Sequence, residues 1–255
     1  MTTIADLLDQ HPQFQVPTQY RIAADMGRTT ICFHNFYEQL FRGEDTPVTV
    51  HLCLFDSAGR EIGHVAERVA TGAVLQYDLG RTGVRESGLV GVVAVPEFDI
   101  KAKAAGKFRV KRSIGTGFYV LWEDTSGHVD TMHEWLAVRR APIGPSGYSF
   151  VIDAGGGAIK RHGLIATNPC LGQDGTAELK IDICTADRRM LGSRTAAQLA
   201  PMGSALCFLD DLFPDIAGWL SANGPLVVRA FGKNLAEPFT LEVHRSGDFH
   251  IHHIN

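Results

Sequence analysis

The chain ends in Ser-Gly-Asp-Phe-His-Ile-His-His-Ile-Asn, residues 246–255, where polar and apolar side chains alternate. A similar stretch, Ser-Gly-His-Val-Asp-Thr-Met-His-Glu-Trp, occupies residues 126–135. Both open with Ser-Gly and place a histidine six residues after the glycine, at His133 and His253. Because alternation with a period of two is typical of a half-buried β-strand, the pattern predicts the same strand at two places in the chain.

Further similarities between the two halves follow the same order along the chain. The matching pairs are residues 31–35 with 164–168, 55–63 with 184–192, 77–79 with 208–212, 88–89 with 218–220, and 118–133 with 239–253. The spacing between partners exceeds 100 residues, which is the size of a domain and too long for a solenoid repeat. The sequence therefore predicts an internal duplication.

Each copy contains short runs of β-branched and aromatic residues, separated by Gly, Asp and Asn about every 8–12 residues. This rhythm is typical of antiparallel sandwiches and barrels. Ahead of the first copy, Thr3-Ile4-Ala5-Asp6 has the pattern of a capping box and predicts a helix that stops near Pro12. We predict an all-β fold: two similar antiparallel β-sandwich or barrel domains from an internal duplication, with one short N-terminal helix.

The expected boundaries follow from composition. We assign residues 1–20 to the N-terminal helix and lead-in, 21–140 to the first β domain, and 150–255 to the second. The linker is placed at residues 141–149, because their Pro and Gly content interrupts any regular element. We further expect the two domains to pack about a pseudo-two-fold axis.

Composition limits the class of partner and compartment. Net charge is -4, which gives no electrostatic reason to expect nucleic acid or a membrane surface as partner. Five cysteines without a CxxC pair predict reduced thiols, and neither a signal peptide nor a bilayer-spanning run is recognisable. We expect a soluble cytoplasmic protein whose partner is a small molecule or another protein, with homo-oligomer formation as an option.

The repeated histidines form one candidate site. In each strand His133 or His253 shares the more apolar face, so the two imidazoles would approach one another if the copies pack symmetrically. With Glu134 beside them, they are candidate catalytic residues, as an acid/base pair, or metal ligands. The competing interpretation is a pair of core histidines hydrogen-bonded to the main chain.

The opposite face of the last strand carries a second candidate site. His250 and His252 form an HxH pair whose ring nitrogens point to the same side, as in several strand-based zinc and iron sites. The pair resembles the HxH of the cupins, but the glutamate and later histidine of that pattern do not follow. The candidate ligands for zinc or iron are His250, His252, His253, His133 and Asp130, with Glu134, His128, His244 and His162 as further options for a third ligand. The competing interpretation is a solvated strand face.

Other motifs do not support a known chemistry. His133-Glu134 begins an HExxH pattern that lacks its second histidine. Residues 153–157 are rich in glycine but lack phosphate-loop spacing, so we expect a glycine-rich hairpin there. The basic run at residues 101–112 is either a solvated loop or a contact for an anionic partner.

Two function hypotheses remain open. The first is a non-catalytic binding or interaction protein with a histidine-rich site between the two repeats. The second is a metal-dependent enzyme, hydrolytic or oxidative, that uses the C-terminal histidines. The absence of a recognised catalytic motif favours the first, whereas the exchange of Asp130 and Met132 for His250 and His252 between the copies favours the second.

Overall fold

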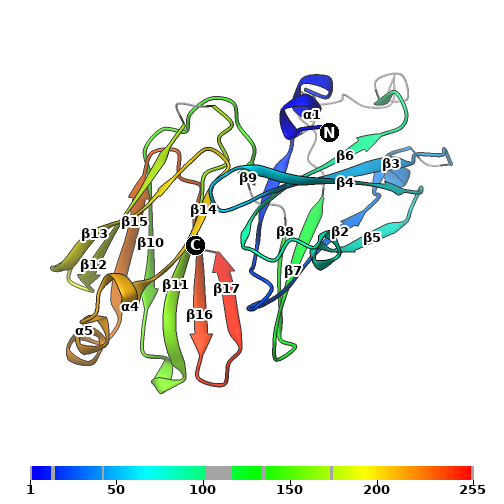
Figure 1. Ribbon diagram of the computed structural model, residues 1–255. Helices are drawn as coiled ribbons and strands as arrows, with labels where there is room; N and C mark the ends of the chain where they lie inside the picture. Colours follow the sequence, from blue (N-terminus) through cyan, green and yellow to red (C-terminus); the bar gives the residue numbers. More distant parts are fainter. Residues whose placement is uncertain are drawn as a thin grey trace. The chain divides into compact units, whose positions relative to one another are not determined.

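Over the residues it describes, the computed structural model is mostly β, with four small antiparallel sheets and a few short helices (Figure 1). It describes residues 2–12, 15–41, 43–100, 117–133, 136–172 and 175–253. The chain divides into two compact units. Unit 1 comprises residues 1–56, 61–122 and 131–138, and unit 2 comprises residues 57–60, 123–130 and 139–255. The all-β class predicted from the sequence is confirmed.

The first half of the chain forms two sheets, with strand orders β4-β3-β6-β1-β9 and β5-β2-β7-β8. Its elements are α1 (Ile4–Gln10), β1 (Pro17–Arg21), β2 (Gly27–His34), α2 (Tyr37–Leu40), β3 (Val48–Phe55), β4 (Glu61–Val69), β5 (Val74–Asp78), the 3-10 helix η1 (Leu79–Thr82), β6 (Gly88–Pro96), β7 (Phe118–Asp124), β8 (Val129–His133) and β9 (Leu136–Ala137). The predicted helix is confirmed as α1, and the capping box between Thr3 and Asp6 is present.

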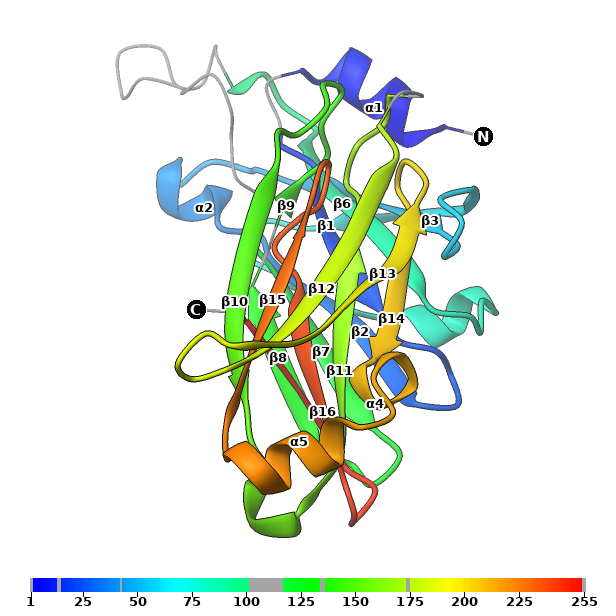
Figure 2. The same ribbon diagram turned by 90° about the vertical axis from the view of Figure 1, so that its left-hand side faces the viewer.

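The second half also forms two sheets, with strand orders β10-β15-β12-β13 and β14-β11-β16-β17. Figure 2 shows the first of these with its four strands side by side. Its elements are β10 (Ser146–Ile152), the 3-10 helix η2 (Gly155–Gly157), β11 (Ile159–Thr167), β12 (Ala177–Thr185), β13 (Met190–Leu199), β14 (Ser204–Phe208), α4 (Leu209–Leu212), α5 (Ile216–Asn223), β15 (Leu226–Gly232), β16 (Phe239–His244) and β17 (Phe249–His253).

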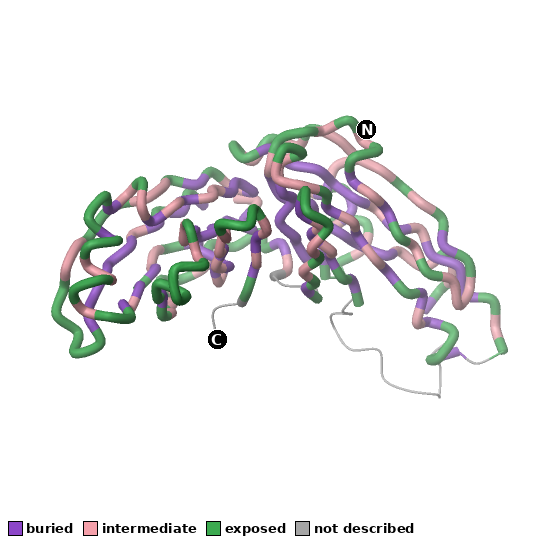
Figure 3. Tube along the Cα trace, turned by 90° about the horizontal axis from the view of Figure 1, so that it is seen from below, coloured by how far each residue is buried: buried purple, intermediate pink, exposed green. Residues whose placement is uncertain are grey.

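Most residues of β3, β6 and β12 are buried, whereas the edge strands β4 and β13 have one buried residue each, and exposed residues gather at the turns (Figure 3). In unit 2, buried apolar side chains from both sheets form one core, including Leu164 of β11, Ile181 of β12 and Val228 of β15. These side chains contribute the burial of apolar area that holds two sheets face to face. None of the helices in the described ranges is long and apolar enough to cross a membrane.

The two halves have the same strand order. β4-β3-β6-β1 in the first corresponds to β13-β12-β15-β10 in the second, and β5-β2-β7-β8 corresponds to β14-β11-β16-β17. A buried asparagine also has the same role in both halves. The amide of Asn35, after β2, donates to three main-chain carbonyls, and the amide of Asn168, after β11, does the same. Among the strands of the described residues, β9 has no counterpart.

Two details predicted from the sequence are wrong. The match of residues 88–89 with 218–220 pairs the start of β6 with the middle of α5, because a Gly-apolar pair is too short to define a register. The glycine-rich segment 153–157 is not a hairpin, since β10 and β11, which it joins, belong to different sheets.

The predicted boundaries overlap regular elements. The lead-in includes α1 and most of β1, and residues 146–149 of the predicted linker are the first residues of β10. Pairing of β10 with β15 therefore begins immediately after Pro145. The basic run at residues 101–112 lies outside the described residues.

Candidate functional site

Two hairpins with the same turn carry the candidate site. The β7–β8 hairpin turns at residues 124–128, and the β16–β17 hairpin turns at residues 244–248. In each, the first turn residue donates its N–H to the carbonyl of the fifth at 2.9 Å, and the glycine adopts positive φ, +88° at Gly127 and +102° at Gly247. Positive φ favours glycine, which explains the repeated Ser-Gly. Residues 123–130 and the whole β16–β17 hairpin belong to unit 2.

Two aspartates of the first hairpin bind the main chain of β17, which is the edge strand of its sheet. The Phe249 N–H donates to Asp124 Oδ2 at 3.1 Å, and the Ile251 N–H donates to Asp130 Oδ2 at 2.7 Å. A bare strand edge is a template for unwanted pairing. The two carboxylates accept hydrogen bonds from two N–H groups of the β17 edge, and they hold the two hairpins together within unit 2.

Asp124 is the more buried of the two carboxylates, with 5% of its surface exposed. Burial raises the pKa of Asp124, but hydrogen bonds from the Ser126 hydroxyl and from the Phe249, His128 and Ser126 N–H groups outweigh it, so the pKa lies below its usual value. The charged carboxylate is therefore part of the folded hairpin.

We expect Asp124→Asn to destabilise the protein by about 1–2 kcal/mol at neutral pH, because charge-assisted hydrogen bonds are lost. A depressed pKa contributes stability above the unfolded value of 3.8, and that stability is lost as the pH falls through the folded pKa. Urea unfolding should show the difference from wild type shrinking below that pH. Asp25→Asn, at an exposed site, is the control, and an unchanged difference at low pH would contradict the prediction.

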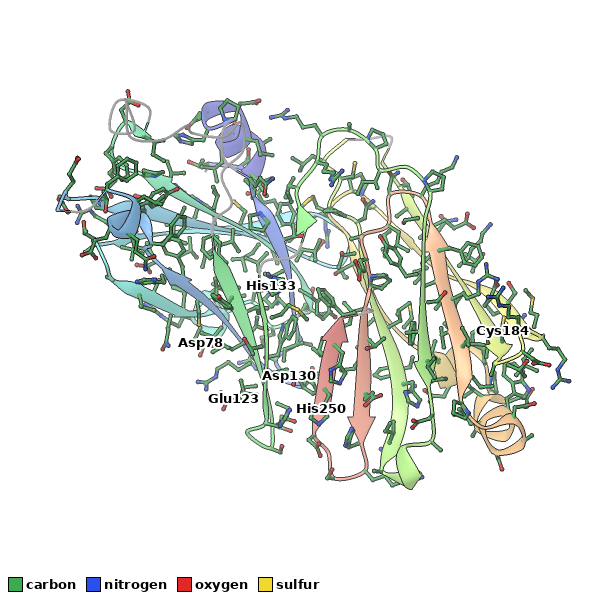
Figure 4. All side chains as sticks on the ribbon, turned by 180° about the vertical axis from the view of Figure 1, so that it is seen from behind. Asp78, Glu123, Asp130, His133, Cys184 and His250 are labelled. Atoms are coloured by element: carbon green, nitrogen blue, oxygen red, sulfur yellow. The ribbon has the colours of Figure 1, made fainter. Side chains whose placement is uncertain are left out.

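Three side chains converge where the two hairpins meet: His128 and Asp130 from the first, and His250 from β17. Figure 4 shows Asp130 and His250 next to one another. Asp130 Oδ1 lies 3.3 Å from His128 Nε2 and 3.6 Å from His250 Nδ1, and the three ligand atoms lie within 4.8 Å of one another. All three side chains are partly buried. This group, His128–Asp130–His250, can hold a metal ion.

His250 also belongs to a second group, His244–Asp248–His250. Asp248 Oδ2 lies 3.5 Å from both His244 Nδ1 and His250 Nε2, so carboxylates flank His250 on both ring nitrogens. The pKa of Asp248 is lowered chiefly by the Ser246 hydroxyl, and the two imidazoles lower it further. Since one neutral imidazole offers one lone pair, the two groups compete for His250.

The two groups follow from an exchange between equivalent positions of the hairpins. The first turn position is Asp124 or His244, the fifth is His128 or Asp248, and the seventh is Asp130 or His250. At each position one hairpin has an acid and the other a histidine. Side by side, the hairpins place carboxylates next to imidazoles.

A cleft of about 350 Å³ in unit 2 adjoins this cluster. It lies between residues 149–152 of β10 and the sheet that contains β17, and His162, Glu242 and His252 contribute to its wall. Glu242 Oε2 is 3.8 Å from His244 Nε2, which links the cleft to the second group. The cleft leaves space for a small molecule next to the cluster.

The structure brings together some of the predicted ligands. Asp130 and His250 meet, and His128 and His244, two further options for a third ligand, are beside them. His252 stacks on His250, with ring centroids 5.8 Å apart, but is exposed and belongs to neither group. Asp248 was not predicted as a ligand, although it occupies the same turn position as His128 when the two turns are aligned.

The first predicted site is not assembled from described side chains. His133 is exposed, as are Val129 and Thr131, whereas Met132 is buried, so the more apolar face of β8 is not the buried one. Alternation defines two faces but does not show which one packs inward, and Met132 provides the buried contact. Glu134 and the side chain of His253 lie outside the described residues; the backbone of His253 pairs with Phe239. The approach of His133 to His253 stays a prediction.

Comparison with known proteins does not identify the family. No family model matches the chain, and no curated protein matches it. Among solved structures, the chain is similar to the exo-chitosanase CsxA of Amycolatopsis orientalis, at 10% identity and a TM-score of 0.19, and to a CsxA variant in complex with PNP-beta-D-glucosamine, at 9% and 0.19. Each match covers 93% of this chain and 26% of the chitosanase chain. Such low TM-scores support neither a fold nor a function.

Proposed function

We propose that this chain is a tandem β-sandwich binding protein, derived by duplication, that binds one divalent transition metal ion at His128, Asp130 and His250. The duplication is supported by the shared strand order, in which β1 and β10 are counterparts, and by the twin asparagines. The observation that carries the metal proposal is the convergence of three ligand atoms within 4.8 Å.

The ligand spacing fits a tetrahedral ion. With metal–nitrogen and metal–oxygen bonds of about 2.0–2.1 Å, two ligands of tetrahedral zinc lie about 3.3 Å apart. Asp130 Oδ1 is 3.3 Å from one imidazole nitrogen and 3.6 Å from the other. Two edges of the coordination tetrahedron thus need little rearrangement. Imidazole and carboxylate ligands suit zinc and iron, in agreement with the metals expected from the sequence.

The neighbouring side chains and main chain orient the ligands of the first group, His128–Asp130–His250. Asp130 uses Oδ2 for the Ile251 N–H, which leaves Oδ1 for the metal. With the metal on His250 Nδ1, His250 Nε2–H faces Asp248, and this carboxylate fixes the tautomer of the ligand, as outer carboxylates commonly do in zinc sites. His244 then holds Asp248 in place.

The two groups make opposite predictions for titration with zinc. We expect tag-free wild-type protein to bind one zinc ion in calorimetry, and His128→Ala to lose roughly 100-fold or more in affinity because it removes a direct ligand. His244→Ala should lose only about tenfold, at the low end of the roughly 10–100-fold that outer-shell partners contribute, because His244 acts on the ligand only through Asp248. The reverse order would place the ion at His244–Asp248–His250. No binding by the wild type would leave the cluster as a hydrogen-bond network and overturn the proposal.

A metal-dependent enzyme is the second candidate, favoured by the open coordination position. Three protein ligands leave a fourth position for water or substrate, and the cleft with His252 and Glu242 adjoins it. The catalytic candidates His133, Glu134 and His253 remain predictions. Metal-loaded protein that hydrolyses or oxidises a test substrate, with no turnover by His250→Ala, would favour this function over simple binding.

A further inference from the structure

Unit 1 contains a buried arginine with unused donors. Arg21 is the last residue of β1, and only 2% of its surface is exposed. Its Nη2 donates to the Phe55 carbonyl at 3.4 Å, but Nε and Nη1 have no hydrogen-bond partner. Within the described ranges, no carboxylate lies at ion-pair distance from it. Burial lowers the pKa of Arg21, and the charges of Tyr20 and Glu86 only partly offset this effect. A buried guanidinium with two unbonded donors is costly, so this geometry points to a missing anionic partner.

Arg21 lines a pocket of about 200 Å³ that other donors share. Arg28 lies on the wall, with Asp78 Oδ2 at 3.8 Å, so the residues that line the pocket carry two arginines and one carboxylate. Thr29 is buried, and its hydroxyl accepts the Ile22 N–H, which leaves the hydroxyl proton to donate. Positive charge and free donors together select an oxyanion.

The fold itself does not require an arginine here. Arg21 pairs with Gly88, the first residue of β6. At the corresponding place in unit 2, Ile152 ends β10 and pairs with Leu226, the first residue of β15, and both side chains are in the apolar core. Unit 1 therefore has an Arg–Gly pair where unit 2 has an apolar pair.

Gly88 makes room for the guanidinium and the strand behind it. A Cβ at this position would lie 2.0 Å from the Phe55 carbonyl oxygen and 3.2 Å from Arg21 Nη2. The glycine thus permits the close approach that places the arginine under the pocket. Both members of the pair serve the pocket, not the core.

We propose that this pocket binds a small oxyanion, a carboxylate or phosphate group, with Arg21 as its principal partner. A volume of about 200 Å³ is below that of drug-sized ligand pockets and fits a group of a few heavy atoms. Arg21 and the Thr29 hydroxyl donate to the anion, and Arg28 adds positive charge at the rim. This site is independent of the metal site in unit 2.

Thermal unfolding of the full chain tests the proposal with acetate, inorganic phosphate and sodium chloride at equal ionic strength. A ligand that binds only the folded state stabilises it, so acetate or phosphate should raise the Tm of the wild type by a few degrees, with saturation, whereas chloride should not. The anion that acts at lower concentration identifies the carboxylate or the phosphate class. Equal shifts with all three salts would overturn the proposal.

Arg21→Met assigns the effect to this residue. Removing an unpaired buried charge is often neutral or stabilising, so the variant should have a Tm no lower than the anion-free wild type, and the anion-dependent shift should disappear. Arg194→Gln, at an exposed position in unit 2, should respond as the wild type does. A full response from Arg21→Met would contradict the assignment.

A second variant, which keeps the positive charge, tests the proposal even if Arg21→Met does not fold. Arg21→Lys retains the cation but lacks the planar guanidinium, so anion affinity measured by calorimetry should fall at least tenfold. Affinity equal to that of the wild type would show that the anion binds elsewhere, and the proposal would fail.

Discussion

Replacing His250 with alanine is expected to weaken zinc binding by roughly 100-fold or more, a loss of about 2.7 kcal/mol in binding free energy. The size of the effect follows from its position, because His250 is the one residue that both candidate groups share. Whichever group holds the ion, the variant removes a ligand, whereas His128→Ala and His244→Ala each affect one group directly. Calorimetric titration of metal-free protein measures the change.

The matched control is His162→Ala, in the same sheet as His250. His162 is partly buried, its Nε2 lies 2.8 Å from the Asp153 carbonyl oxygen, and it belongs to neither metal group. This variant should bind zinc as the wild type does. If both variants bind equally well, zinc is held outside the cluster and the proposed function is wrong.

Asn168→Ala should lower the free energy of unfolding by roughly 3 kcal/mol. The side chain is fully buried, its Nδ2 donates to the carbonyls of Gly175, Leu199 and Ala200 at 2.6 to 3.1 Å, and its Oδ1 accepts the Cys170 N–H. Alanine removes all four bonds. The Ala200 carbonyl keeps the Gly203 N–H at 2.8 Å, but each group left unsatisfied typically costs about 1–3 kcal/mol, with less than full additivity. Urea unfolding followed by tryptophan fluorescence and by circular dichroism measures the loss.

Asn35→Ala provides the companion test, since Asn35 makes the same three-carbonyl contact in unit 1. We expect a loss of similar size. Asn223→Ala, a partly exposed asparagine that caps α5, is the control and should cost about 1 kcal/mol or less. A loss below about 1 kcal/mol for Asn168→Ala would show that the carbonyls find other partners.

Part of the candidate site was predictable because local patterns encode it. Alternation in residues 246–255 indicated the last strand, and the HxH pair put His250 on a polar face. The similar stretch at residues 126–135 indicated Asp130 as a candidate ligand. Asp248 was not predicted as a ligand because it occupies a turn, where aspartate is a common residue. Its equivalence to His128 is recognised only when the two turns are aligned.

The burial of β8 could not be predicted from the sequence, for a physical reason. Alternation assigns side chains to two faces with a period of two, but either face can pack inward. Val129, Thr131 and His133 looked more apolar as a set, yet Met132 is the buried residue. Neighbouring strands, not composition, decide which face is covered.

By itself, the sequence determined the β class, the capped N-terminal helix, the repeated strand after each Ser-Gly and two of the metal-ligand candidates, because each depends on residues close together in the chain. Only the tertiary structure decided that Asp130 meets His250 and that Arg21 is buried beside Gly88 with free donors. Those contacts join residues far apart in sequence, and strand pairing and packing create them. A periodic pattern contains no information about which distant segment will be its neighbour.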